Sequence, residues 1–306
     1  MEKHDESSNS VTDIAADGDV ILVVGPERKK LRVHSLILKN VSTAFNAMFG
    51  PHFKEGQGLS GAYPKEIPLP KDSAAALELI CCVIHSRNDA VPDPPLPSEV
   101  LQVAIAADKY DCAVGLKFAG ESWLTYYDIK NTVELGRLMA AAYIFDSAHA
   151  FWKITLELIF HHEGSYLQLV DEDTRHAIPL TIFCLLEERR SMIRTELGQI
   201  LLEVSASPEH IDKSCNCTIL QAFSWMELWP AEIANMSISS AIKKAEAVSS
   251  SVPNQHSTSC YLRYNDNRQK EGLAHGMDII KNRGGLCLDC VRMGRNAGTK
   301  ECRIKH

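Results

Sequence analysis

Residues 18–56 carry the clearest secondary-structure signals in the chain; they read GDVILVVGPERKKLRVHSLILKNVSTAFNAMFGPHFKEG. Two apolar runs in it, Val20–Val24 and Leu31–Val33, flank a Gly-Pro turn and a charged tip at Glu27–Lys30. Apolar runs separated by a short turn of this kind are typical of a β-hairpin. We therefore expect a pair of strands to open the folded part of the chain.

Directly after this hairpin the spacing of the apolar residues lengthens to the helical period of about 3.6 residues. Ser42 is a suitable N-cap for the second part of this helical stretch, and Gly50-Pro51 ends it. The apolar residues able to share one helical side are Leu36, Ile37, Val41, Ala44, Phe45, Met48 and Phe49.

Further motifs follow in a fixed order along about 110 residues. They are Asp19-Val20, Val33-His34-Ser35 with Leu38, Ser42 with 44–49 (AFNAMF), 65–70 (KEIPLP), a helical pattern at 72–85, and 106–110 (AADKY). This order resembles the BTB/POZ domain, and DKYDC at 108–112 with IHSRN at 84–88 is most similar to its filamentous-fungal branch. The resemblance implies a module that binds other proteins.

The resemblance and the periodicity together predict an α+β fold class. We expect a BTB/POZ fold, with a small three-stranded β-sheet packed on a helical bundle, then a mostly α-helical region and a Cys-rich C-terminal region. The expected division is a disordered tail at 1–17, the BTB/POZ domain at 18–128, a helical extension at 129–205 and the Cys-rich region at 206–306.

Composition narrows the function classes. The net charge of −7 does not favour binding of the whole chain to nucleic acid or to anionic membranes. No apolar run approaches the roughly 18 residues that span a bilayer, and residues 1–18 have no hydrophobic core of a signal peptide. We therefore expect a soluble protein of the cytoplasm, the nucleus or both.

Many BTB domains dimerise through a helix and a strand that precede the first core strand. Here the segment Met1–Asp17 is short and rich in Ser, Asp and Glu. We expect the strand-swapped homodimer to be absent or altered.

Ten cysteines in a chain without a secretion signal favour reduced thiols or metal ligands over disulfides. Cys81, Cys82, Cys112 and Cys184 lie within apolar helical patterns, where a cysteine usually acts as a small buried apolar residue. The other six lie in the last third of the chain, and these require a separate explanation.

The sharpest local pattern among them is Cys287-x2-Cys290-x11-Cys302-x3-His306. Thiolate and imidazole are the ligands of tetrahedral zinc, and two pairs about a dozen residues apart can close such a site. Cys215, Cys217 and Cys260 are competing ligands, so the site could instead join Cys215 and Cys217 to Cys287 and Cys290. In either arrangement the protein fills all four positions, which indicates a structural zinc and not a catalytic one.

Phe53-Lys54-Glu55 matches the apolar-x-Glu element by which some BTB domains hold a cullin-type ubiquitin-ligase scaffold. An exposed aromatic ring can anchor in a partner's pocket while the neighbouring carboxylate sets the orientation. The alternative is that Phe53 covers the edge of the core and Glu55 is solvated. The expected function is accordingly that of a non-enzymatic adaptor or scaffold, with a cullin as a candidate partner.

No phosphate-binding loop, dinucleotide fingerprint or serine-nucleophile motif occurs in the chain. Asp19 and His34 lie close together in the hairpin without a nucleophile, and we assign them structural roles. We therefore predict no enzyme activity.

An alternative function is that of a nuclear transcriptional regulator whose basic, zinc-stapled C-terminal region contacts DNA. Residues 261–306 carry ten Lys and Arg against five Asp and Glu, so the positive charge is concentrated there. The candidate phosphate-binding residues are Lys281, Arg283, Arg292, Arg295, Lys300, Arg303 and Lys305. Because no aromatic residues alternate with these charges for base stacking, nucleic acid is the less favoured partner.

Overall fold

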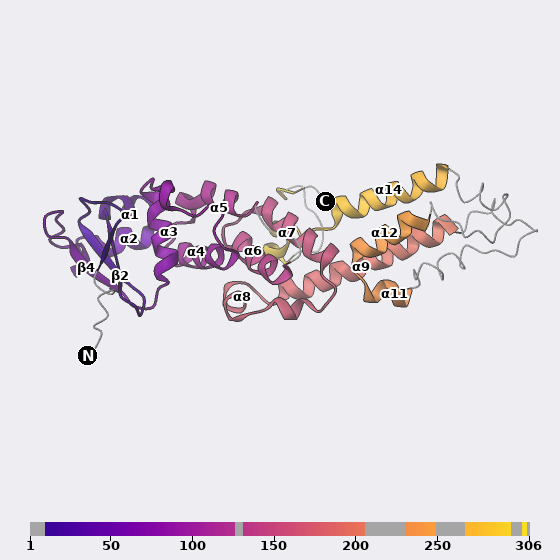
Figure 1. Ribbon diagram of the computed structural model, residues 1–306, viewed down its shortest axis with the longest axis horizontal. Helices are drawn as coiled ribbons and strands as arrows, with labels where there is room; N and C mark the ends of the chain where they lie inside the picture. Colours follow the sequence, from indigo (N-terminus) through magenta and orange to yellow (C-terminus); the bar gives the residue numbers. More distant parts are fainter. Residues whose placement is uncertain (1–9, 126–130, 206–229, 249–266, 295–301, 305–306) are drawn as a thin grey trace, which may run out of the picture. The chain divides into compact units, whose positions relative to one another are not determined.

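The computed structural model describes residues 10–125, 131–205, 230–248, 267–294 and 302–304 (Figure 1). The chain divides into two compact units. The first comprises residues up to 128 with 134–150 and 172–178, and the second comprises 129–133, 151–171 and 179–306. Among the described residues, no helix combines the length and the apolar character that crossing a bilayer requires.

The first unit contains a four-stranded mixed sheet covered by helices. The strands are β1 (Val11–Asp13), β2 (Val20–Val24), β3 (Lys29–Val33) and β4 (Lys65–Leu69). The helices are α1 (Ser35–Val41), α2 (Thr43–Met48), η2 (Lys54–Gly56), α3 (Ala74–Ile84), η3 (Asn88–Ala90), α4 (Pro97–Lys109), η4 (Ala113–Leu116), α5 (Lys117–Trp123), most of α6 (Thr132–Ile144) and α8 (Glu172–Ala177).

The predicted hairpin forms the centre of this sheet. Strands β2 and β3 are antiparallel, with Val20 opposite Val33 and Val24 opposite Lys29. Gly25 begins the turn between them with a positive φ of 74°, a conformation that glycine adopts without steric cost. Strand β4 joins β2 in parallel, so the spatial order is β1-β3-β2-β4. Because β2 is central, Val20, Leu22 and Val24 are fully buried.

The sheet differs from the sequence prediction at one edge. We predicted three strands and no ordered structure in residues 1–17, but Val11–Asp13 forms β1, parallel to β3. Ile14, which follows it, is buried, and its amide donates to the carbonyl of Arg32. The buried Ile14 side chain and the backbone pairing with β3 order this polar segment. Neither contact produces a repeating apolar pattern that could be recognised in the sequence.

The helical motif around Ser42 forms the core of the first unit. The Ser42 hydroxyl accepts from the amide of Phe45, so it caps α2 as predicted, and it also donates to the carbonyl of Tyr110. The Phe45 ring stacks on Tyr110 with centroids 4.4 Å apart, and on Phe49 at 5.7 Å. The AFNAMF and DKYDC motifs are thus two sides of one packing contact.

Two local sequence signals in this unit need correction. Asp72, at the start of the helical pattern 72–85, is a suitable N-cap residue by type, but Ser73 caps α3, and the Asp72 carboxylate instead accepts from Tyr110 Oη at 3.0 Å and from Lys109 Nζ at 2.5 Å. The apolar pattern of Ala113–Tyr127 predicts one helix, but in the described part of that segment the 3-10 helix η4 leads directly into α5. The fold class is nevertheless confirmed, as a small mixed sheet with helices.

The second unit is helical. Its elements are most of α7 (Ala148–His161), η5 (Tyr166–Leu169), α9 (Thr181–Ser205), α11 (Pro230–Asn235), α12 (Ile238–Val248), α14 (Asn267–Arg283) and α15 (Leu288–Met293). Helices α9, α12 and α14 lie side by side (Figure 1). Their buried residues include Leu197, Ile242 and Ile280.

This unit contains one helix that we did not expect, and one sequence-based expectation fails in it. The basic segment 261–306 contains the 17-residue helix α14, which packs on α9. Cys184, predicted to be buried, is exposed, because α9 turns Ile182, Phe183 and Leu186 inward instead. Cys81, Cys82 and Cys112 are buried as expected.

Candidate functional site

The backbone of the Phe53–Glu55 loop is held in place by several contacts. The Phe53 amide donates to the carbonyl of Gly50 at 3.3 Å, and the Gly56 amide donates to the carbonyl of Phe53 at 3.2 Å. The Lys65 ammonium group donates to the carbonyls of Lys54 and Gln57. A Cβ on Gly56 would lie 2.3 Å from the carbonyl oxygen of Gly50. Only glycine at position 56 therefore allows the loop to pack this closely against the residues that follow α2.

On this fixed backbone the Phe53 side chain is 52% exposed, while Glu55 is half-buried two residues later. An aromatic ring that is already exposed and already positioned loses little conformational freedom when it enters a partner's pocket. The arrangement therefore suits docking of another protein. Because half of the Phe53 side chain is exposed, the alternative interpretation, in which Phe53 only covers the edge of the core, is less favoured.

Asp19 and His34 have the structural roles expected of them. The Asp19 carboxylate accepts from the amide of Ser35 at 2.8 Å and from its hydroxyl at 2.6 Å, at the start of α1. Burial opposes ionisation of Asp19, but the hydrogen bonds from Ser35 outweigh it, so the pKa lies below its ordinary value. The His34 amide donates to Nε2 of His85 at 3.1 Å. The Asp19 side chain and the His34 backbone amide thus hold the corner between β3 and α1.

The second candidate site is a cluster of three cysteines. Cys287 is the N-cap of α15, Cys290 lies in its first turn, and Cys302 comes from the segment that follows. Their Sγ atoms all lie within 4.8 Å of one another, with 3.6 Å between Cys290 and Cys302. Two of the three side chains are buried, and Cys302 is half-buried. Among the described His, Cys, Asp and Glu side chains, these three thiols form a group that could hold a metal ion.

The geometry of this cluster fits zinc. A Zn–S bond of about 2.3 Å in a tetrahedron places two sulfurs about 3.8 Å apart, which is close to the 3.6 Å between the Sγ atoms of Cys290 and Cys302. Without a metal, burial first and then hydrogen bonds with Cys302 and Cys287 raise the pKa of Cys290 to about 12. A bound cation reverses this effect, because it binds the thiolate and displaces the proton. Cys215, Cys217, Cys260 and His306 lie outside the described residues.

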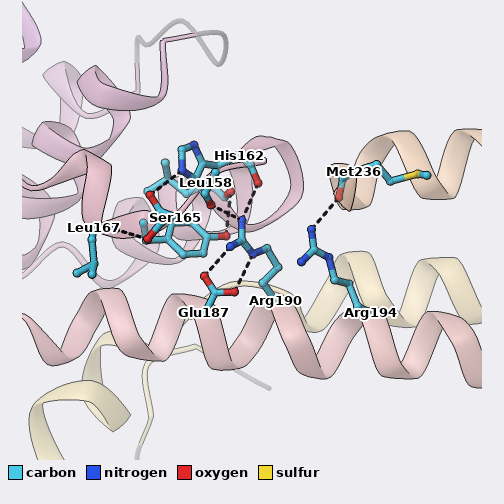
Figure 2. Close-up of polar contacts among 10 residues, drawn as sticks. Leu158, His162, Ser165, Leu167, Glu187, Arg190, Arg194 and Met236 are labelled. Carbon is cyan, nitrogen blue, oxygen red and sulfur yellow. Dashed lines mark hydrogen bonds and ion pairs between the residues drawn. The ribbon is translucent and has the colours of Figure 1, made fainter. Parts of the chain in front are cut away.

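A buried polar network in the second unit was not predicted from the sequence (Figure 2). Arg190 is only 4% exposed, and its NH1 donates to the carbonyls of His162 at 3.0 Å and Gly164 at 2.8 Å. Its guanidinium group also pairs with Glu187 and lies 4.4 Å from the centre of the Tyr166 ring. These donors hold the chain between α7 and η5 against α9, so the network is structural. In sequence Arg190 has the same appearance as a solvated helix residue.

Arg194, one turn after Arg190, connects α9 to the segment before α12. Its NH2 donates to the carbonyl of Met236 at 2.8 Å. Burial, followed by the charge of Arg190, lowers the pKa of Arg194 below its ordinary value. The two arginines therefore fix two different segments to one helix.

The model of the BTB/POZ domain family matches residues 15–117. The first unit contains a BTB/POZ domain. No curated protein was found to match the chain. A BTB/POZ domain is a protein-interaction fold and is generally non-enzymatic, and the exposed Phe53 lies inside the matched residues.

Proposed function

We propose that the protein is a non-enzymatic adaptor or scaffold that recruits other proteins through its BTB/POZ domain, in the cytoplasm or the nucleus. The observation that carries this proposal is the half-exposed Phe53 ring on a backbone fixed by Gly50, Gly56 and Lys65. Surface aromatic residues in such positions are the typical anchors of protein interfaces. The partner most consistent with Phe53-Lys54-Glu55 is a cullin, which would make the protein a substrate adaptor of a cullin-type ubiquitin ligase.

The test is a binding assay between the full chain and the N-terminal region of a cullin. Removing an anchor ring typically costs 2 kcal/mol or more, so Phe53→Ala should weaken binding at least about 30-fold. Glu55→Ala should weaken it less. Tyr63→Ala is a matched control, because Tyr63 is an aromatic residue of a nearby loop and is 85% exposed. Equal binding by all three variants, or none by the parent chain, would contradict the cullin assignment.

We also propose that Cys287, Cys290 and Cys302 hold a structural zinc ion, with His306 as the fourth ligand. Zinc bound by four protein ligands has no open position for a substrate, so its contribution would be folding free energy for the C-terminal segment. Metal analysis of the purified protein should find one equivalent of zinc, and Cys302→Ser and His306→Ala should each lose it. Loss in a Cys215→Ser/Cys217→Ser variant, with retention in Cys302→Ser, would favour the competing ligand set.

The alternative function, a nuclear regulator that contacts DNA, has weaker support. Two of the basic residues proposed for DNA binding lie next to carboxylates. Lys281 Nζ is 3.7 Å from Oε1 of Glu246, and NH2 of Arg303 is 2.6 Å from Oδ1 of Asp289. Carboxylates next to these cations reduce the charge available to phosphates. A DNA mobility-shift assay over a salt titration is the test, and tight binding with a steep salt dependence would favour this alternative over the adaptor.

A further inference from the structure

The three thiols of the cysteine cluster come from two separate segments of the chain. Cys287 and Cys290 belong to the start of α15, while Cys302 arrives 12 residues after Cys290. Zinc binds more tightly when both segments are already held in the same place. The structure shows one anchor for each segment, and neither anchor involves a thiol.

The first anchor fixes the chain before Cys287 to helix α7. The amide of Leu286 donates to Oγ1 of Thr155 at 2.9 Å, across 131 positions of sequence. Thr155 is fully buried, and its own hydroxyl donates to the carbonyl of Phe151 at 2.8 Å. A Cβ on Gly285 would lie 2.4 Å from the carbonyl oxygen of Trp152, so the backbone is pressed directly on the helix.

The second anchor fixes the segment of Cys302 to α15. The Asp289 carboxylate accepts from the backbone amide of Arg303 at 2.8 Å. It also accepts from the Arg303 guanidinium group, from Nε at 2.9 Å and from NH2 at 2.6 Å. Asp289 is the neighbour of Cys290, and Arg303 is the neighbour of Cys302, so these three hydrogen bonds align the two thiols that lie 3.6 Å apart.

We propose that Thr155 and Asp289 are positioning residues of the metal centre: they assemble the three thiols before the ion arrives, and they contribute no ligand themselves. This inference rests on the proposed zinc site. Because thiols that are already held close together lose less conformational entropy when the ion binds, the two anchors raise the affinity for zinc. Groups that orient metal ligands in this way are typically worth 10- to 100-fold in affinity. The metal would then tie the end of the described chain to α7.

The experiment measures zinc affinity of the full chain by competition with a chromophoric chelator. Asp289→Asn and Thr155→Val should each weaken zinc binding by roughly 10- to 100-fold. Thr155→Ser keeps the hydroxyl and should restore most of the affinity. Asp278→Asn, which changes an exposed carboxylate of α14, is the matched control and should bind zinc like the parent.

A second measurement separates positioning from ligation. The cobalt(II)-loaded Asp289→Asn and Thr155→Val variants should show the parent's sulfur-to-metal absorption at saturation, because all three thiolates remain, whereas Cys302→Ser should show less. Since Thr155 is buried, the Asp289→Asn arm decides the outcome if Thr155→Val fails to fold. Parent-like affinity in Asp289→Asn, with loss in Cys302→Ser, overturns the positioning role alone. Absence of zinc binding in the parent overturns the zinc site itself, and this inference with it.

Discussion

Ser42 shows how one side chain can account for a whole sequence motif. Its hydroxyl accepts from the amide of Phe45 and donates to the carbonyl of Tyr110, so it caps α2 and joins that helix to the end of α4. Ser42→Ala removes a cap and leaves a buried carbonyl without its donor, which should lower the free energy of unfolding by about 2–3 kcal/mol. Urea denaturation measures this change.

Thr43→Ala is the control for that substitution. Thr43 is exposed and donates to the exposed carboxylate of Asp111, so its loss should change the free energy of unfolding by no more than about 0.5 kcal/mol. If the two variants were equally stable, the buried bond to Tyr110 would not have the weight that we assign to it.

His85 should make the first unit less stable in mild acid. Its Nε2 accepts from the amide of His34 and its Nδ1 donates to the carbonyl of Cys81 at 2.8 Å, so the ring is bound in its neutral form. Burial lowers its pKa below 6.5, the bond to Cys81 opposes this, and the charge of His34 adds to the lowering. The unfolded chain therefore takes up a proton at a higher pH than the folded chain does.

It follows that stability is complete above about pH 6.5 and decreases as the pH falls toward the pKa of the folded state. The imidazole pKa can be measured directly by NMR titration, and unfolding by urea at pH 7.5 and 5.5 should give a lower free energy at the acid pH. His162 in the second unit has a pKa lowered mainly by burial and acts in the same direction, so His85→Gln should remove only part of the difference. A folded-state pKa of His85 above 6.5 would refute this.

Among the helices and strands, those with a clear apolar repeat or a known motif could be predicted from the sequence. The β2–β3 hairpin, the Ser42 cap and most helices follow from apolar spacing and turn residues, which are local properties. Strand β1 could not be predicted, because Val11–Asp13 has no apolar period and is ordered by pairing with β3 and by the buried Ile14 that follows it. Helix α14 was missed because its net positive charge obscured the small apolar stripe, including Met277 and Ile280, that packs on α9.

The packing of α14 on α9 can be tested with two glycines. Gly198 in α9 has open space where a Cβ would be, so Gly198→Ala should raise the free energy of unfolding by about 0.5–1 kcal/mol through helix propensity alone. Gly276 in α14 is buried, and a Cβ there would lie 2.9 Å from Cδ1 and 3.2 Å from Cγ2 of Ile200. Gly276→Val should therefore lower the free energy of unfolding by about 1–3 kcal/mol.

Thermal or urea denaturation of both variants distinguishes a packed helix from an independent one. If α14 did not pack on α9, valine at position 276 would produce no steric conflict, and the two variants would differ only by helix propensity.

At the scale of the whole molecule, the candidate sites were predictable to different degrees. Both candidate sites contain short motifs, namely Phe53-Lys54-Glu55 and the spacing of Cys287, Cys290 and Cys302, so their residues could be selected from the sequence. The exposure of Phe53 and the proximity of the three thiols are visible only in the three-dimensional structure. Thr155 could not be selected at all, because it meets Leu286 only through the fold. Side chains that position a site from a distant helix have no sequence pattern of their own.

The pairing of strand β1 bears on the assembly of the chain. In a strand-swapped BTB dimer, the first strand leaves its own chain and pairs with a partner. Here β1 pairs with β3 of the same chain, from Val11 opposite Lys30 to Asp13 opposite Arg32. Ile14 is only 5% exposed, and its carbonyl accepts from Arg87 at 3.4 Å. Because the strand is already bound within its own sheet, exchange would give no additional pairing.

We therefore expect this 306-residue chain to be a monomer of 33.9 kDa in light scattering after size exclusion, at micromolar concentration. Ile14→Asp should loosen β1 and expose more of the edge of β3, which is an unpaired template for another strand. That variant should therefore dimerise or aggregate more readily than the parent, whereas Leu36→Asp, a change at an exposed residue of α1, should leave the parent's mass unchanged. A parent chain at twice the monomer mass that Leu36→Asp converts to a monomer would show instead that dimerisation occurs through α1.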